Sequence, residues 1–155
     1  TLEGAVITVN SESESCLNHR GDWLGIGCNI YPYRGYWVIV SEADSLCIED
    51  GNPTDPAIQY SLQNGANLIS FPVEGSVEIS YSLPDDIEGF VSGIIGEGVA
   101  SNNQPPWQGS LSALSGGNGY WMIITDDISF SFNTAIGRAW EEDPGFGHSI
   151  RSLKD

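Results

Sequence analysis

The chain has 155 residues, of which 40% are hydrophobic and 10% aromatic. A chain of this length buries roughly 70% of its unfolded surface, enough for one core or two small ones that share an interface. Its 5 Lys and Arg against 21 Asp and Glu give a net charge of −16. This charge excludes nucleic-acid binding, which depends on clustered basic residues, and the short apolar runs predict no membrane insertion.

The first half predicts several short strands. On the segment 35–40, Tyr36, Val38 and Val40 face one way while Trp37 and Ile39 face the other, so both faces are apolar and need a cover. Polar residues 10–21 predict a loop. We expect strands at residues 4–9, 23–30, 35–40 and 45–48, with a turn at Pro32.

Three cysteines, Cys16, Cys28 and Cys47, lie in this half. At most one internal disulfide forms, with three possible pairings, and no spacing matches a zinc or redox motif. We expect Cys16 to pair with Cys28, which stabilises the fold by roughly 2–3 kcal/mol on the loop-entropy model. The alternative is three reduced thiols that pack as small hydrophobic side chains.

Residues 49–56 favour non-repeating backbone and predict a boundary between two halves. Beyond it, Leu83, Ile87, Val91 and Ile94 recur at steps of three and four, which predicts an amphipathic helix. Gly89 and Gly93 each cost that helix about 1 kcal/mol relative to Ala, so packing must hold it. In chain order we expect strands at residues 58–62, 66–73 and 77–81, a helix at about 83–96, and strands at 109–114, 120–125 and 129–132.

A motif occurs twice, at a constant offset of 84 residues. A Trp is followed by Gly two residues on and by Gly-Tyr-Trp twelve residues on. The agreement continues, since residues 38–41 align with residues 122–125. The first copy consists of Trp23, Gly25, Gly35, Tyr36 and Trp37, and the second of Trp107, Gly109, Gly119, Tyr120 and Trp121.

The sequence therefore predicts a mainly β (α+β) protein with antiparallel sheets, a β-sandwich of two related half-modules and one short helix at about 83–96. Residues 1–51 form a truncated or divergent first half-module, and residues 57–132 form a complete second module. Residues 133–155 are a C-terminal tail without sustained periodicity, which either crosses its own domain or docks on a neighbour. The tail holds three of the five basic residues: Arg138, Arg151 and Lys154.

Four segments of the second half, in order, carry a resemblance. They read NGANLISFPV, LPDDIEGFVSGIIGEGVA, WQGSL and GGNGYWMII, within residues 64–132. This part resembles a repeated module of large secreted or surface-displayed proteins, mostly of marine bacteria, and of related metagenomic or viral sequences. The resemblance implies a structural repeat of a long, non-enzymatic exported protein, with no catalytic residues to carry over. Residues 1–22 lack the NLISFPV strand and the helical segment expected before a GYW unit.

Acidic turns are candidates for a calcium site, because Ca²⁺ binds carboxylate oxygens. The candidate ligands do not fit the EF-hand spacing, and the alternative is solvated acidic turns. They are Glu49, Asp50, Asp55, Asp126 and Asp127.

The aromatic side chains are candidates for a glycan-stacking platform, because such rings combine a large apolar face with a polar group. The candidates are Trp23, Trp37, Trp107 and Trp121, together with the tyrosines Tyr31, Tyr33 and Tyr36. Their duplication at equal spacing favours a repeated core element instead. No catalytic constellation emerges, since His19 and His148 lie in polar segments without a hydrolase pattern, and residues 93–98 lack the Lys of a phosphate-binding loop.

We therefore expect a non-enzymatic structural or adhesive unit of a secreted, extracellular or cell-surface assembly, such as a filament, surface layer or virion. Self-association or neighbouring subunits would engage terminal segments, residues 1–9 and 133–155, by strand addition. The alternative is a carbohydrate-binding module that uses its aromatic residues to hold glycans.

Overall fold

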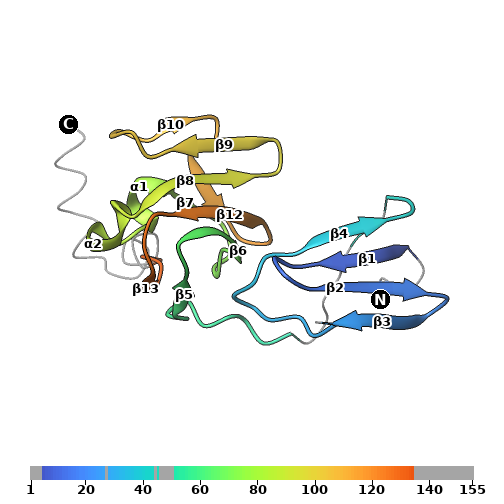
Figure 1. The fold of residues 1–155 in the computed structure, drawn as a ribbon. Coiled ribbons are helices and arrows are strands. Elements are labelled where there is room, and N and C mark those ends of the chain that lie inside the picture. The colour runs from blue at the N-terminus through green and yellow to red at the C-terminus, as the bar shows by residue number, and fades with distance from the viewer. Residues whose placement is uncertain (1–4, 27, 44, 46–50, 135–155) are drawn as a thin grey trace, which may run out of the picture.

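The computed structural model describes residues 5–26, 28–43, 45 and 51–134 (Figure 1). The fold is mainly β, as predicted, and every strand pairing in these residues is antiparallel. The first half folds as a four-stranded sheet, which we call the first sheet. Its order is β3 (Asp22–Ile26), β2 (Ser15–His19), β1 (Val6–Asn10) and β4 (Trp37–Val40).

Residues 57–134, which we call the second module, contain a five-stranded sheet, two strand pairs and two short helices. The sheet has the order β10 (Gln108–Gly109), β9 (Val99–Asn102), β8 (Val91–Gly96), β12 (Gly119–Ile124) and β6 (Gly65–Ser70). The pairs are β11 (Ala113–Ser115) with β7 (Ser76–Glu78) and β13 (Ile128–Phe130) with β5 (Tyr60–Leu62). The helices are α1 (Ile79–Ser82) and α2 (Asp85–Glu88).

The main hydrophobic core lies inside the second module. Apolar side chains from both strand pairs and both helices converge on one face of the five-stranded sheet. Aromatic rings dominate one end, where Phe132 makes edge contacts with Tyr60, Phe71 and Phe130 at centroid distances of 5.0–5.2 Å. Such pairs stabilise a core beyond the area that they bury. Every member of this core lies between Tyr60 and Phe132.

The predicted helix at residues 83–96 is wrong. Only α2 forms within it, and from Val91 the chain runs as strand β8. A register shift in the β8–β12 ladder explains the misleading period, since Ile123 pairs with Gly93 and Ile124 with Val91, leaving one extra residue. A bulge of this kind places Val91 and Ile94 on one face three residues apart, which imitates helical spacing.

Several other boundaries also differ from the sequence predictions. The polar segment 10–21, predicted as a loop, contains strand β2, and the strand predicted at 77–81 ends at Glu78, where α1 begins. A two-residue turn forms the β2–β3 hairpin, with Arg20 and Gly21 both at positive φ, the twist that such hairpins favour. Apart from Ser45, the strand predicted at 45–48 lies outside the described residues, and so do the first residues of the 49–56 boundary.

The repeat seen in the sequence extends to the pairing of strands. β3, β2, β1 and β4 follow the same order as β10, β9, β8 and β12. Val9 pairs with Cys16 and with Val38, just as Ile94 pairs with Ser101 and with Met122. The β1–β4 ladder even carries a register shift at the place where the β8–β12 ladder has one.

The glycine of each Trp-x-Gly motif has the same structural role. Gly25 has φ +139° and Gly109 has φ +153°, a conformation that side-chain-bearing residues rarely adopt. A Cβ at Gly25 would overlap the carbonyl oxygen of Ser15, and one at Gly109 would overlap that of Ala100. Both motifs thus require glycine where the strand crosses closely over its neighbour.

The first sheet joins the second module through β6. Arg34 forms a bridge with Ile69, while the Gly35 amide donates to the Leu68 carbonyl at 3.1 Å. The Glu12 carboxylate accepts from the Leu68 amide at 3.2 Å. Residues 33–35 therefore cover the edge of β6 that faces away from β12.

Candidate functional site

Exposed apolar side chains gather on the first sheet and the loop that follows it. Fifteen large hydrophobic residues of the described chain are exposed, and twelve of them lie between residues 7 and 40. Ile26 is 78% exposed and Leu24 53%. The other ten are Ile7, Leu17, Trp23, Ile30, Tyr31, Tyr33, Trp37, Val38, Ile39 and Val40. Patches of this kind mark interaction surfaces on soluble proteins.

Both faces of the first sheet contribute to this surface. Cross-strand partners share a face, and the partners Leu24, Leu17, Thr8 and Ile39 run across all four strands. Val38 and Val40 point to the opposite face, since side chains alternate along a strand. Among the described residues, the first sheet is thus a single layer with apolar side chains on both sides, which differs from the covered strand that the sequence predicts.

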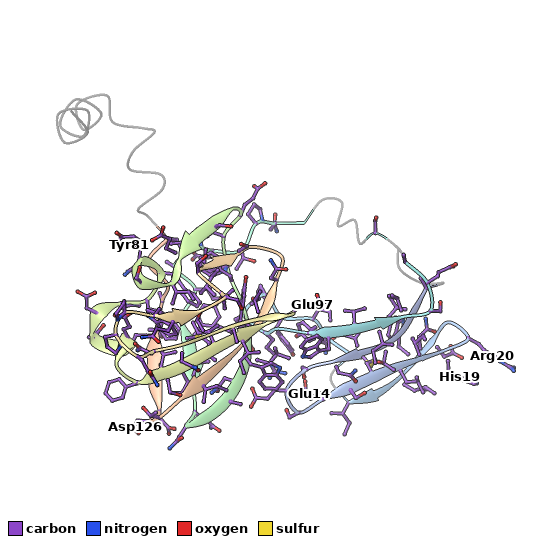
Figure 2. All side chains as sticks on the ribbon, turned by 90° about the horizontal axis from the view of Figure 1, so that it is seen from above. Glu14, His19, Arg20, Tyr81, Glu97 and Asp126 are labelled. Atoms are coloured by element: carbon purple, nitrogen blue, oxygen red, sulfur yellow. A yellow bond between two sulfur atoms is a disulfide. The ribbon has the colours of Figure 1, made fainter. Side chains whose placement is uncertain are left out.

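A groove separates β4 from the second module. It has a volume of about 510 Å³, and Trp37 and Val38 line one wall. The opposite wall comes from the β8–β9 turn at Gly96 and Glu97 and from the loop before Tyr120. In Figure 2, Glu97 lies where the second module approaches the first sheet, whereas His19 and Arg20 lie at the far end of that sheet.

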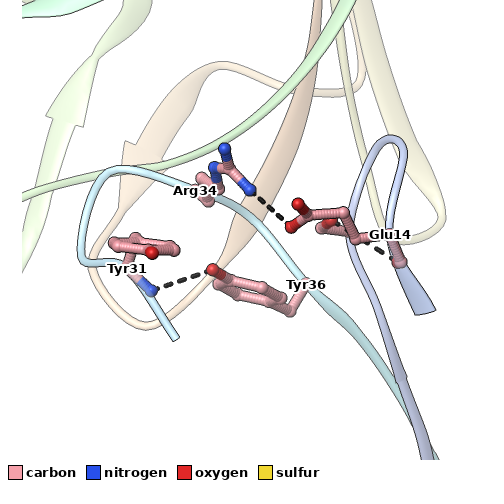
Figure 3. Close-up of polar contacts among 5 residues, drawn as sticks. Glu14, Tyr31, Arg34 and Tyr36 are labelled. Atoms are coloured by element: carbon pink, nitrogen blue, oxygen red, sulfur yellow. Dashed lines mark hydrogen bonds and ion pairs between the residues drawn. The ribbon is translucent and has the colours of Figure 1, made fainter. Parts of the chain in front are cut away.

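A polar cluster holds the junction between the two halves (Figure 3). Arg34 forms an ion pair with Glu14 at 2.7 Å, and its guanidinium lies 5.1 Å from the Tyr31 ring centre. Partial burial lowers the pKa of Arg34, but the Glu14 carboxylate, with Tyr33 and Tyr36, raises it above its ordinary value. Arg34 therefore remains a permanent cation that orders the loop.

A second cavity, of about 460 Å³, lies beside this cluster. Ser11, Glu12, Tyr33 and Arg34 line it from the first half, and residues 59–63 and 67–69 line it from the second module. Burial raises the pKa of Tyr60, which lies in this wall, to about 12. The Tyr60 hydroxyl donates to the Ser70 carbonyl at 2.9 Å. This hydroxyl is therefore neutral and donates at ordinary pH.

The structure does not bring the four predicted tryptophans together into one platform. Trp23 and Trp37 lie on opposite edge strands of the first sheet and on opposite faces. Trp107 packs against the core and donates from Nε1 to the Glu88 carboxylate at 2.6 Å, while Trp121 is half-buried on β12. Trp23, the equivalent of Trp107, is 41% exposed.

The predicted calcium ligands do not form a cluster among the described residues. Asp55 accepts from the Ala57 amide, Asp126 from the Asp127 amide, and Asp127 from the Asn64 amide, so each orders a turn. Glu49 and Asp50 lie outside the described residues. No group of three or more potential metal ligands occurs within the part of the chain that the structure describes.

The predicted disulfide between Cys16 and Cys28 is present. The two Cα atoms lie 5.2 Å apart, and Cys16 is buried. Cys47, the third cysteine, lies outside the described residues. The bond ties the beginning of β2 to the loop after β3.

Sequence reasoning missed the junction cluster and the groove. The sequence predicts a turn around Pro32 with Tyr31 and Tyr33 as further platform candidates, and a loop at Glu14, but it does not predict the contact between Arg34 and Glu14. Their one sequence signal is the aromatic and basic content of the turn, YPYR, because an Arg beside two Tyr rings can form cation–π contacts.

The chain matches no family model, no curated protein and no solved structure. No helix among the described residues is long and apolar enough to cross a membrane.

Proposed function

We propose that this chain is a non-enzymatic structural unit of an extracellular or surface assembly, and that the first sheet is where it contacts its neighbours. The observation that carries the proposal is the concentration of exposed apolar side chains on a sheet with uncovered faces. A net charge of −16 keeps such a unit soluble before it binds a complementary surface on a neighbour. The Cys16–Cys28 disulfide suits an oxidising compartment.

The assembly surface differs from the terminal segments that the sequence suggested. Val6–Asn10 is the interior strand β1, paired with β2 on one side and β4 on the other. A paired interior strand has no free backbone groups to offer a neighbour. Residues 135–155 lie outside the described residues, so the first sheet is the surface that supports this proposal.

Sedimentation velocity over a wide range of protein concentration tests the proposal, together with electron microscopy of the same material. We expect association that strengthens with salt, because screening weakens the repulsion between acidic chains while apolar contacts persist. Val38→Lys should abolish it, and Ile95→Lys is the matched control, since the two side chains are 44% and 45% exposed. A chain that stays monomeric under all these conditions contradicts the proposal.

Glycan binding is the second candidate, and the 460 Å³ cavity favours it over the dispersed tryptophans. Tyr33 and Arg34 offer an aromatic face and a guanidinium, and Glu12 and Gln63 line the same cavity. Such a mixture suits a sugar, which stacks on rings and exchanges hydrogen bonds with polar groups. Glycan-array binding that Tyr33→Ala abolishes and Trp23→Ala leaves intact would support this candidate, and a silent array would reject it.

A further inference from the structure

The first sheet lacks one strand that its counterpart in the second module has. β12 pairs with β8 on one side and with β6 on the other, in a ladder from Gly119–Ser70 to Ile124–Gly65. β4, the equivalent of β12, pairs with β1 on the side that corresponds to β8. Among the described residues no strand pairs with its other side. The open edge of β4 therefore corresponds to the place that β6 fills.

The burial of equivalent side chains agrees with a missing cover. Met122 and Ile124 on β12 are 0% and 2% exposed, whereas their equivalents Val38 and Val40 on β4 are 44% and 41% exposed. In the second module, β6 adds Ile69 to the shared core. The β6 residues opposite Met122 and Ile124 are Asn67 and Gly65, so an added strand at β4 would flank Val38 and Val40 on one side, and the remaining cover in the second module comes from the helices and strand pairs.

The repeat also distinguishes between the two edges of the first sheet. β3 is an edge strand, and so is its equivalent β10. The open edge at β3 therefore has a counterpart in the second module, where β10 is also an edge. The open edge at β4 has no such counterpart, because β12 is paired on both sides. β4 reads Trp-Val-Ile-Val and carries neither the charges nor the proline that normally protect an edge from strand addition.

The groove described above gives the added strand room beside the start of β4. Its walls include Trp37 and Val38 on β4 and Leu68 on β6, so it continues from the junction at which β6 already pairs with residues 33–35. An added strand would therefore extend an interface that exists within the chain.

Charge decides which kind of strand fits. The segment 64–73, which contains β6, has no charged residue, and neither has β4. A chain with a net charge of −16 repels an acidic strand, and the uncharged counterpart β6 indicates an uncharged strand as the occupant. Residues 135–155 carry seven charged residues in twenty-one, and this composition does not match β6.

We propose that the open edge of β4 accepts an uncharged β-strand of the β6 type from a neighbouring polypeptide, which pairs antiparallel with Trp37–Val40 and flanks Val38 and Val40. This inference rests on the proposed assembly function and names the contact that would carry it. Backbone hydrogen bonds would supply affinity, and alternating apolar side chains would supply specificity.

A synthetic peptide with the sequence of residues 64–73 tests the inference. Amide hydrogen exchange of the whole chain is measured with and without the peptide. We expect exchange to slow by about tenfold or more at those amides of residues 37–40 that point to the open edge and do not pair with β1, because paired amides exchange only when the ladder opens. A scrambled peptide and a peptide carrying Ile69→Pro are the controls, since they lose the alternation or one backbone donor.

The outcomes separate this contact from the general function. Protection of β4 that Val38→Lys abolishes and Ile95→Lys preserves supports the inference. Unchanged exchange at β4, equal protection by the scrambled peptide, or protection confined to β3 overturns it. Self-association without peptide binding overturns the strand contact and leaves the assembly function standing. Peptide binding by a chain that never associates upholds the contact and rejects assembly by self-association.

Discussion

The first sheet and the second module share a pairing scheme but differ in what covers it. Four strands of each follow one order, with glycines at matching crossings and register shifts at matching places. In the second module, helices and strand pairs bury one face, and in the first sheet the equivalent residues lie open. The backbone ladder and one disulfide thus support the first sheet without a large core, and its apolar side chains remain available for contacts.

The largest expected effect comes from replacing equivalent side chains on β12 and β4. Met122→Ala removes a fully buried side chain and should cost about 2–5 kcal/mol in the free energy of unfolding. Val38→Ala should cost below about 1 kcal/mol, because 44% of that side chain is already exposed. Urea denaturation of both variants measures the difference. Equal costs would show that the first sheet has a cover in solution.

The disulfide should matter chiefly to the first sheet. Replacing Cys16 and Cys28 with Ser should cost roughly 3 kcal/mol, since the bond closes a short loop in the unfolded chain. Hydrogen exchange should accelerate in β2 and β3 and stay unchanged in β9 and β10. Ser101→Ala, at the position equivalent to Cys16, is the control and should affect β9 and β10 instead. Uniform acceleration across both regions would contradict this division.

Alkaline pH should act on the second module through Tyr60. Burial raises the pKa of Tyr60 to about 12 from the ordinary value of 10.0, so folding favours the protonated phenol. The stabilisation is complete below pH 10, falls as the pH rises toward about 12, and amounts to about 2–3 kcal/mol at most. Thermal melts across this window should show the decline. Tyr60→Phe should flatten that pH dependence, and a profile unaffected by the substitution would contradict the assignment.

The smallest effect concerns a local hydrogen bond that occurs in both copies. The Tyr36 hydroxyl accepts from the Tyr31 amide at 2.8 Å, and the Tyr120 hydroxyl accepts from the Ser115 amide at 2.9 Å. Replacing either tyrosine with Phe should cost about 1 kcal/mol, and more at Tyr120, where the bond is better shielded from water. Chemical denaturation of the two variants compares them. A larger loss at Tyr36 would reverse the expected order.

Sequence patterns predicted the parts of the fold in which local chemistry dominates. The mainly β class, the strands around the Gly-Tyr-Trp motifs and the Cys16–Cys28 pair all follow from alternation, turn residues and loop length. The repeat was also visible, because its glycines and aromatic residues serve the same backbone crossings in both copies.

The missed elements depend on contacts between distant parts of the chain. The bulge in β8 turned an alternating strand into a helix-like pattern, and only the pairing with β12 reveals it. The composition of β2 is typical of a polar loop. Its pairing with β1 and β3 determines its structure more than its composition does. The candidate site is an exposed surface. Whether a side chain is exposed depends on which elements pack over it, and sequence patterns do not reveal that packing.

Cys16 and Ser101 anchor equivalent strands to the loops that follow the Trp-x-Gly motifs, but with different chemistry. The Ser101 hydroxyl donates to the Leu111 carbonyl, whereas Cys16 is bonded covalently to Cys28. The first anchor forms as soon as the chain folds, in any solution. The second needs an electron acceptor, so the redox potential of the surroundings determines when the first sheet is fixed. During synthesis under reducing conditions, the second module would reach its final form first, and the surface proposed for assembly would be fixed last.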